Sequence, residues 1–147
     1  MENPYAPPQA NLEKDVLVLR KKTGWKIVFW CYLFIEVVGV ASMLFGGDEP
    51  VFDLVGEIVV YSLAFIGIFA FAYNKKIATP QLWRMVILLL LMWDCYIFLS
   101  GYVDGSYDGL ELSALLIIGS IVVPMLFLQY FALYQYAFQS KEIWNKP

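Results

Sequence analysis

The feature that most constrains this chain is a set of four apolar runs, each long enough to cross a lipid bilayer as a helix. They cover residues 26–45, 52–73, 82–101 and 112–138. The hydrocarbon core of a bilayer needs about 20 helical residues to span it. Charged residues make up 16% of the chain, whereas soluble domains average about 25%. The sequence therefore predicts an all-α integral membrane protein, a four-helix bundle.

The segments outside these runs are short. Residues 1–25 open with the proline-rich stretch "MENPYAPPQAN" and end in a basic segment beside the first run, which predicts a flexible tail. Residues 26–138 form the predicted transmembrane domain, and residues 139–147 form a second short tail. The first run starts late and no small-residue cleavage site follows it, so we expect a retained helix and not a cleaved signal.

The basic residues predict the topology. All ten Lys and Arg lie before or at the start of the first run, between the second run and the start of the third, or after the fourth. The connectors "GGDEPVFD" and "SGYVDGSYDGLE" contain none. Short loops rich in Lys and Arg stay in the cytoplasm. We therefore expect a multi-pass protein of the bacterial inner (plasma) membrane, in contact with the lipid bilayer, with both termini in the cytoplasm.

Two carboxylates lie in the middle of predicted spans. Glu36 lies within "LFIEVVGV" in the first run, and Asp94 lies at a similar depth in the third. A membrane-embedded acid costs about 2.5–3.5 kcal/mol on insertion scales and normally faces the bundle interior or a wet cavity. The chain has no histidine, and no Lys or Arg lies at that depth to pair with either acid.

Helical spacing suggests which residues accompany these acids. Residues three, four and seven positions apart share a face of a helix. This places Tyr32, Glu36 and Gly39 on one face of the first span, where the glycine would allow close helix approach. The second span offers Asp53, Glu57, Tyr61 and Ala64 at the same spacing. We therefore predict a polar interior lined by Glu36, Asp94, Tyr61, Tyr32 and Ser120.

Two hypotheses follow for this interior. In the first, Glu36 and Asp94 bind a proton, a sodium ion or a cationic substrate and cycle between states. In the second, they are protonated struts that pin one helix to another or to a partner chain. The sequence leaves both open.

A further group of acids, Asp48, Glu49, Asp53 and Glu57, gathers at the start of the second run. Oxygen ligands of this kind suit Ca²⁺ and Mg²⁺, but the spacing is not that of a known calcium loop. Acids are also favoured at a helix N-terminus by the helix dipole. We therefore expect capping and topology to explain the group, and we predict no metal site and no cofactor.

Catalysis has no support in the sequence. It lacks histidine, a Gly-x-Ser-x-Gly elbow and a phosphate-binding loop. We therefore predict that the protein is not an enzyme and has no catalytic residues. The basic residues are too few and too close to the membrane to indicate nucleic acid as a partner.

Several stretches carry a resemblance to known proteins. The tail "NPYAPP" at 3–8, with "GWKIVFW" at 24–30, "AYNKKIATPQLW" at 72–83 and "LLMWDCY" at 90–96, resembles a group of small uncharacterised four-helix bacterial inner-membrane proteins. This resemblance covers most of the chain and implies no activity.

A more local resemblance is to the small multidrug resistance transporters. "IEVVGVASMLF" at 35–45 and "LVGEIVVYSLAF" at 54–65 are similar to the first two helices of that family. The resemblance places Glu36 at its cation-binding glutamate and Tyr61 at its second-helix tyrosine. The third run departs from the family, because it carries Asp94 and lacks the family's glycine-rich segment.

These observations lead to one predicted function and one alternative. We predict an accessory or assembly component that acts through helix packing, as a homodimer or within a larger membrane complex. The alternative is a small proton- or cation-coupled transporter that uses Glu36 and Asp94. Four helices enclose little volume, so transport would need a dimer.

Overall fold

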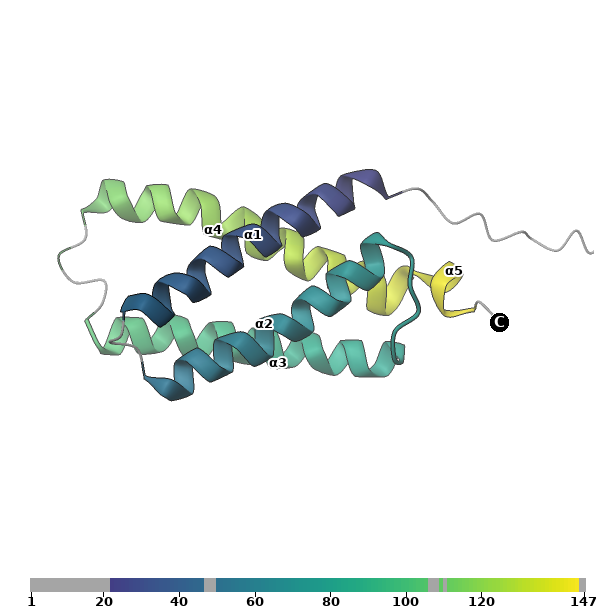
Figure 1. Ribbon diagram of the computed structural model, residues 1–147, viewed down its shortest axis with the longest axis horizontal. Coiled ribbons are helices and arrows are strands. Elements are labelled where there is room, and N and C mark those ends of the chain that lie inside the picture. The colour runs from purple at the N-terminus through teal and green to yellow at the C-terminus, as the bar shows by residue number, and fades with distance from the viewer. Residues whose placement is uncertain (1–21, 47–49, 106–108, 110, 146–147) are drawn as a thin grey trace, which may run out of the picture.

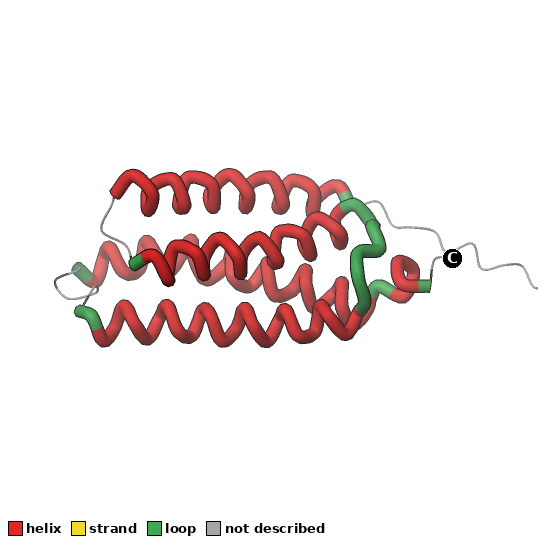
Figure 2. The backbone as a smooth tube through the Cα atoms, turned by 60° about the horizontal axis from the view of Figure 1, so that its bottom comes forward, coloured by secondary structure: helices red, strands yellow, loops and turns green. Residues whose placement is uncertain are grey.

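The computed structural model describes residues 22–46, 50–105, 109 and 111–145. Four long helices follow one another: α1 (Thr23–Gly46), α2 (Val51–Ala72), α3 (Pro80–Val103) and α4 (Leu112–Tyr134). A π-helical segment, η1 (Gln135–Gln139), and the short helix α5 (Lys141–Trp144) complete the chain. Helices account for 87% of the described residues, which contain no strand (Figure 2). The predicted all-α fold is confirmed.

All four long helices are long and apolar enough to cross a membrane, the last one together with η1. The protein is therefore a multi-pass helical membrane protein. The predicted runs match the helices closely. The largest differences are at the start of α1, which begins at Thr23 and not at residue 26, and at the end of α4, where η1 replaces the α-helix after Tyr134. Pro80 lies in the first turn of α3, where its fixed φ suits a helix start. The hydroxyl of Thr79 caps that turn by accepting a hydrogen bond from the Leu82 N–H at 3.3 Å.

The four long helices run alternately in opposite directions (Figure 1). The two ends of the bundle differ in charge. One end, here called the basic end, holds the start of α1, the α2–α3 connector, the start of α3, η1 and α5. The other, the acidic end, holds the end of α1, the start of α2, the end of α3 and the start of α4. The described basic residues all belong to the basic end: Lys22, Lys26, Lys75, Lys76, Arg84 and Lys141.

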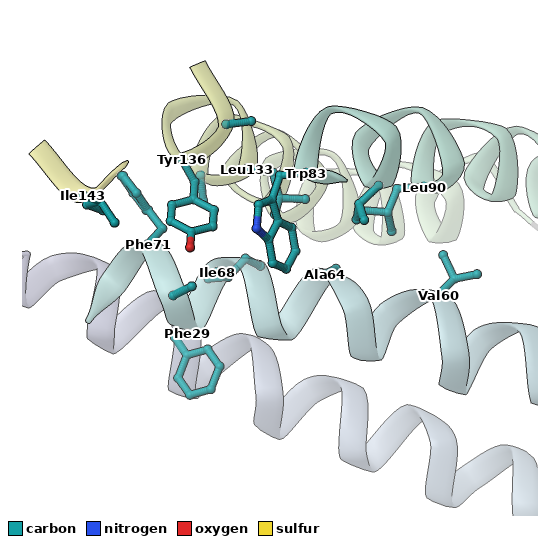
Figure 3. Close-up of a cluster of buried hydrophobic side chains, with 14 residues drawn as sticks. Phe29, Val60, Ala64, Ile68, Phe71, Trp83, Leu90, Leu133, Tyr136 and Ile143 are labelled. Carbon is teal, nitrogen blue, oxygen red and sulfur yellow. The ribbon is translucent and has the colours of Figure 1, made fainter. Parts of the chain in front are cut away.

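The tightly packed core lies toward the basic end (Figure 3). Trp83 of α3, Ile68 of α2 and Leu133 of α4 are all at most 1% exposed. Gly67 makes this packing feasible, because a Cβ there would lie 2.4 Å from Leu133 Cδ2 and 2.7 Å from Trp83 Cζ3. Real Cβ atoms do not approach other atoms so closely. The α2–α3–α4 contact therefore depends on the missing side chain.

Hydrogen bonds hold the α2–α3 connector against this core. Asn74 adopts a left-handed φ of 53° after the end of α2, a conformation that Asn tolerates better than most residues. The Tyr136 hydroxyl donates to the Lys75 carbonyl at 2.8 Å and accepts from the Ile77 N–H at 3.0 Å. The Trp83 indole donates to the Ile77 carbonyl at 2.7 Å. The connector is thus tied to both α3 and η1.

Packing is looser toward the acidic end. Among the described residues, none is fully buried in α1 after Tyr32, in α2 before Val60, in α3 after Leu90, or in α4 before Gln129. Gly39, which we expected to allow close helix approach, has no neighbour within 4 Å of a Cβ built on it. That expectation was wrong, because the close approaches are made by glycines of α2.

Candidate functional site

Asp94 is held by two tyrosines from different helices. The Tyr61 hydroxyl of α2 donates to one carboxylate oxygen at 2.7 Å, and the Tyr130 hydroxyl of α4 donates to the other at 2.6 Å. Both distances are typical of strong O–H···O bonds. The carboxyl group thus joins α2, α3 and α4, and both of its oxygens are engaged.

A polar seam continues from this point toward the acidic end. The Trp93 indole donates to the Glu57 carboxylate at 3.2 Å, and the Tyr96 hydroxyl donates to Asp53 at 2.9 Å. The predicted α2 face of Asp53, Glu57, Tyr61 and Ala64 therefore faces α3. Gly56 lies beside the seam, where a Cβ would come within 1.8 Å of the Trp93 ring.

The seam contains both described members of the acidic group at the start of α2. Asp53 and Glu57 accept hydrogen bonds from aromatic donors of α3. Among the described residues, no cluster of His, Cys, Asp or Glu could hold a metal ion. Asp48 and Glu49 lie outside the described residues.

Glu36 lies in a different environment, on a pocket of about 390 Å³ between α1 and α2. Glu57, Tyr61 and Ser62 of α2 also line this pocket. The remaining lining is apolar and comes from both helices: Leu33, Val37, Val40, Ala41, Leu44, Ile58 and Phe65. The pocket therefore combines an apolar wall with two carboxyl groups.

Glu36 makes no hydrogen bond or ion pair with any residue that the structure describes. Glu57 and Asp94 are nevertheless close enough to interact with it electrostatically. Tyr61 connects the two acids, since it lines the Glu36 pocket and donates to Asp94. The structure thus links Glu36 to Asp94 through Tyr61 and gives the two acids different surroundings.

Tyr32 and Gln129 form a second polar contact, between α1 and α4. Tyr32 is 5% exposed, and its hydroxyl donates to the Gln129 side-chain oxygen. The Gln129 amide nitrogen is buried and has no hydrogen-bond partner among the described groups. Ser120 is not part of the interior, because it is exposed and donates to the Ile117 carbonyl of its own helix at 2.7 Å. The prediction for Ser120 was wrong.

Two participants, Tyr130 and Trp93, were missed from the sequence. Tyr130 provides half of the hydrogen bonding of Asp94, and Trp93 binds Glu57. Glu57 was predicted as part of the acidic group and of the Tyr61 face, but not as a neighbour of Glu36, whose pocket it shares. The position of Glu57 one turn before Tyr61 was a usable signal. Tyr130 offered none, because α4 is apolar on every side and its sequence does not show which face turns inward.

Comparison with known proteins adds no further evidence: no protein-family model, curated protein or solved structure matches the chain.

Proposed function

We propose that this chain is a small inner-membrane transporter that binds a cation at Glu36 in the α1–α2 pocket. The observation that carries the proposal is that Glu36 lies at mid-span on a pocket, without a hydrogen bond or ion pair to any described residue. Acids inside membrane helices normally have a partner or mark a substrate or ion path. A bound cation would supply the missing partner.

The pocket lining favours an organic cation over a bare metal ion. Its volume of about 390 Å³ falls within the roughly 300–1,000 Å³ that is typical of small-molecule sites. Small metal ions need several oxygen ligands close together, whereas most of this lining is aliphatic or aromatic carbon. A cation with an apolar body would match both the apolar wall and the two carboxyl groups.

The carboxyl group of Glu36 would also couple cation binding to proton release. A carboxyl that is protonated while the pocket is empty and releases its proton when a cation enters would exchange one for the other. In this proposal Asp94 is a strut, because both of its oxygens already accept hydrogen bonds. The cation would therefore bind through Glu36, with Glu57 beside it.

We also propose that the basic end faces the cytoplasm of a bacterial cell. Support comes from the six described basic residues at that end and from the acids Asp53, Asp104 and Glu111 at the other. Cytoplasmic loops carry an excess of Lys and Arg. Both termini would then lie inside.

Calorimetric titration of the purified full chain in detergent with tetraphenylphosphonium tests the binding site. We expect binding to the wild type and a loss of at least roughly tenfold in affinity for Glu36→Gln, as for other charged contacts. Glu111→Gln is the matched control, since it makes the same change at an exposed site outside the pocket. Equal affinity of the Glu36→Gln variant and the wild type would refute the site.

Titration in two buffers with different ionisation enthalpies tests the coupling. A proton released on binding makes the observed heat depend on the buffer, and Glu36→Gln should remove that dependence. Binding at Glu36 without proton release would leave a cation site but rule out the exchange.

The accessory role remains a second candidate function. It is favoured by the acidic-end half of α4, where Leu116, Ile117 and Val123 are 63–65% exposed and could pack against another chain. The accessory role would be favoured if another membrane protein co-purified with the Glu36→Gln variant of this chain but not with the Ile117→Asn variant. Cation binding that depends on Glu36 would favour the transporter.

A further inference from the structure

A second pocket, of about 380 Å³, lies at the basic end, away from Glu36. The start of α1, the end of α2 and the segment from η1 to α5 form its walls. Lys22, Trp25 and Phe71 lie on one side, and Gln135, Gln139 and Glu142 come from the C-terminal part. This pocket combines charged, amide and aromatic groups, in contrast to the mostly apolar α1–α2 pocket.

Lys22 is the distinctive residue of this pocket. Its amine is buried, has no hydrogen-bond partner among the described groups, and lies 3.5 Å from the centre of the Phe71 ring. Burial lowers the pKa of Lys22 to about 8, and the carboxylate of Glu142 offsets only part of that effect. The charged amine is therefore under-solvated, and an anion beside it would be favourable.

Glu142 lies on the same pocket but does not neutralise Lys22 directly. The two residues interact electrostatically, yet neither makes an ion pair with a described residue within 4 Å. Opposite charges that share a pocket without contact suit a ligand that carries both charges. An anion alone would satisfy Lys22 and be repelled by Glu142.

The other walls fit each end of such a ligand. The first N–H groups of a helix have no partner within the helix and favour a phosphate, and Thr23 and Gly24 at the start of α1 line the pocket. Trp25 stacks on Phe131 at 5.9 Å and meets Phe71 edge-on at 5.3 Å. The Phe71 face already holds the Lys22 amine, which leaves half-buried Trp25 as the aromatic group of the lining that could attract a ligand ammonium group.

The depth of the pocket indicates the source of the ligand. Lys22 immediately precedes the membrane-spanning helix α1, and Trp25 lines the pocket. Tryptophans are enriched at the level of lipid headgroups. We propose that this pocket binds the phosphoethanolamine headgroup of a membrane phospholipid, with the phosphate at Lys22 and the ammonium at Glu142.

Native mass spectrometry of the delipidated full chain in detergent tests the proposal. The added probes are phosphatidylethanolamine, phosphatidylglycerol and free phosphoethanolamine. We expect phosphatidylethanolamine to bind best and its affinity to fall roughly tenfold on Lys22→Gln or Glu142→Gln, as for a lost charged contact. Lys141→Gln, which removes a neighbouring exposed charge outside the pocket, should leave binding unchanged. Lys22→Arg should retain binding, because it keeps the positive charge. That result would show that the site needs the charge.

Three outcomes would overturn the proposal. Equal binding of phosphatidylglycerol with no effect of Glu142→Gln would mean a site for anionic lipid only. Equal losses for Lys22→Gln and Lys141→Gln would mean diffuse surface attraction. Free phosphoethanolamine that binds as tightly as the lipid would refute a lipid source. Helical circular dichroism of each variant shows whether a loss of binding reflects unfolding.

Discussion

The regions around Asp94 and Glu36 differ in how completely the protein satisfies a carboxyl group. At Asp94, tyrosines from α2 and α4 occupy both oxygens of the carboxyl group. At Glu36, the carboxyl lines an apolar pocket and makes no hydrogen bond or ion pair with a described residue. Similar depth in a membrane therefore does not imply a similar role. The hydrogen-bond donors that neighbouring helices provide determine how each carboxyl group is satisfied.

The largest expected effect tests whether packing differs between the core toward the basic end and the part of α1 that carries Glu36. Gly67→Ala would force a Cβ into Leu133 and Trp83, and overpacking of this kind typically costs about 1–3 kcal/mol. Gly39→Ala on α1, where a Cβ meets nothing within 4 Å, should change stability by less than about 0.5 kcal/mol. Unfolding by titration with sodium dodecyl sulfate gives both free energies. Equal losses would show that the two regions are packed alike.

Removal of the two carboxyl groups tests the comparison directly. Asp94→Ala leaves two tyrosine hydroxyls without their acceptor, and we expect a loss of about 2 kcal/mol. Glu36→Ala breaks no hydrogen bond seen in the structure, so we expect a loss below about 0.5 kcal/mol. The same unfolding titration measures both. A larger loss for Glu36→Ala would reverse the assignment of strut and binding group.

Single hydroxyl deletions sharpen the Asp94 side of the comparison. Tyr130→Phe and Tyr61→Phe each remove one donor, and interhelical hydrogen bonds in membranes average about 0.6 kcal/mol. If both act through Asp94, neither deletion should cost anything further in an Asp94→Ala background. Additive losses in that double-mutant cycle would show that the tyrosines stabilise the bundle by other contacts.

The smallest expected effect extends the comparison to a third group, Lys22, whose amine has no hydrogen-bond partner among the described residues. Its pKa is about 8 in the folded protein, below the usual lysine value of 10.5. Between these two pH values the unfolded chain holds the proton that the folded chain has released, so stability should rise with pH. Partial exposure makes the rise small. Melting temperatures measured from pH 7.5 to 10.5 should rise more for the wild type than for Lys22→Gln. Parallel profiles of the two proteins would contradict the claim that the Lys22 amine has no partner in the folded protein.

The number, order and limits of the membrane helices could be predicted from the sequence. Long apolar runs can satisfy their backbone in lipid only as helices or closed barrels, and their length suits helices. The shared face of Asp53, Glu57 and Tyr61 also followed from spacing, because a few polar residues mark one side of α2.

The partners across helices could not be predicted. Helices α1 and α4 are apolar on nearly all sides, so their sequences do not indicate which face of each helix turns toward its neighbours. This is why Ser120 was placed inside, Gly39 was given a close contact, and Tyr130 was overlooked. Gly56 and Gly67 matter because of the tryptophan and leucine opposite them, which lie on other helices.

Carbon-13 spectra of the carboxyl groups in lipid bilayers test the central claim most directly. The chain would be labelled at Asp and Glu, with Glu36→Gln and Asp94→Asn used to assign the two resonances, and recorded with and without tetraphenylphosphonium. The account predicts that the Glu36 resonance shifts on addition of the cation while the Asp94 resonance stays in place. A shift of Asp94 with Glu36 unchanged, or no shift of either, would contradict it.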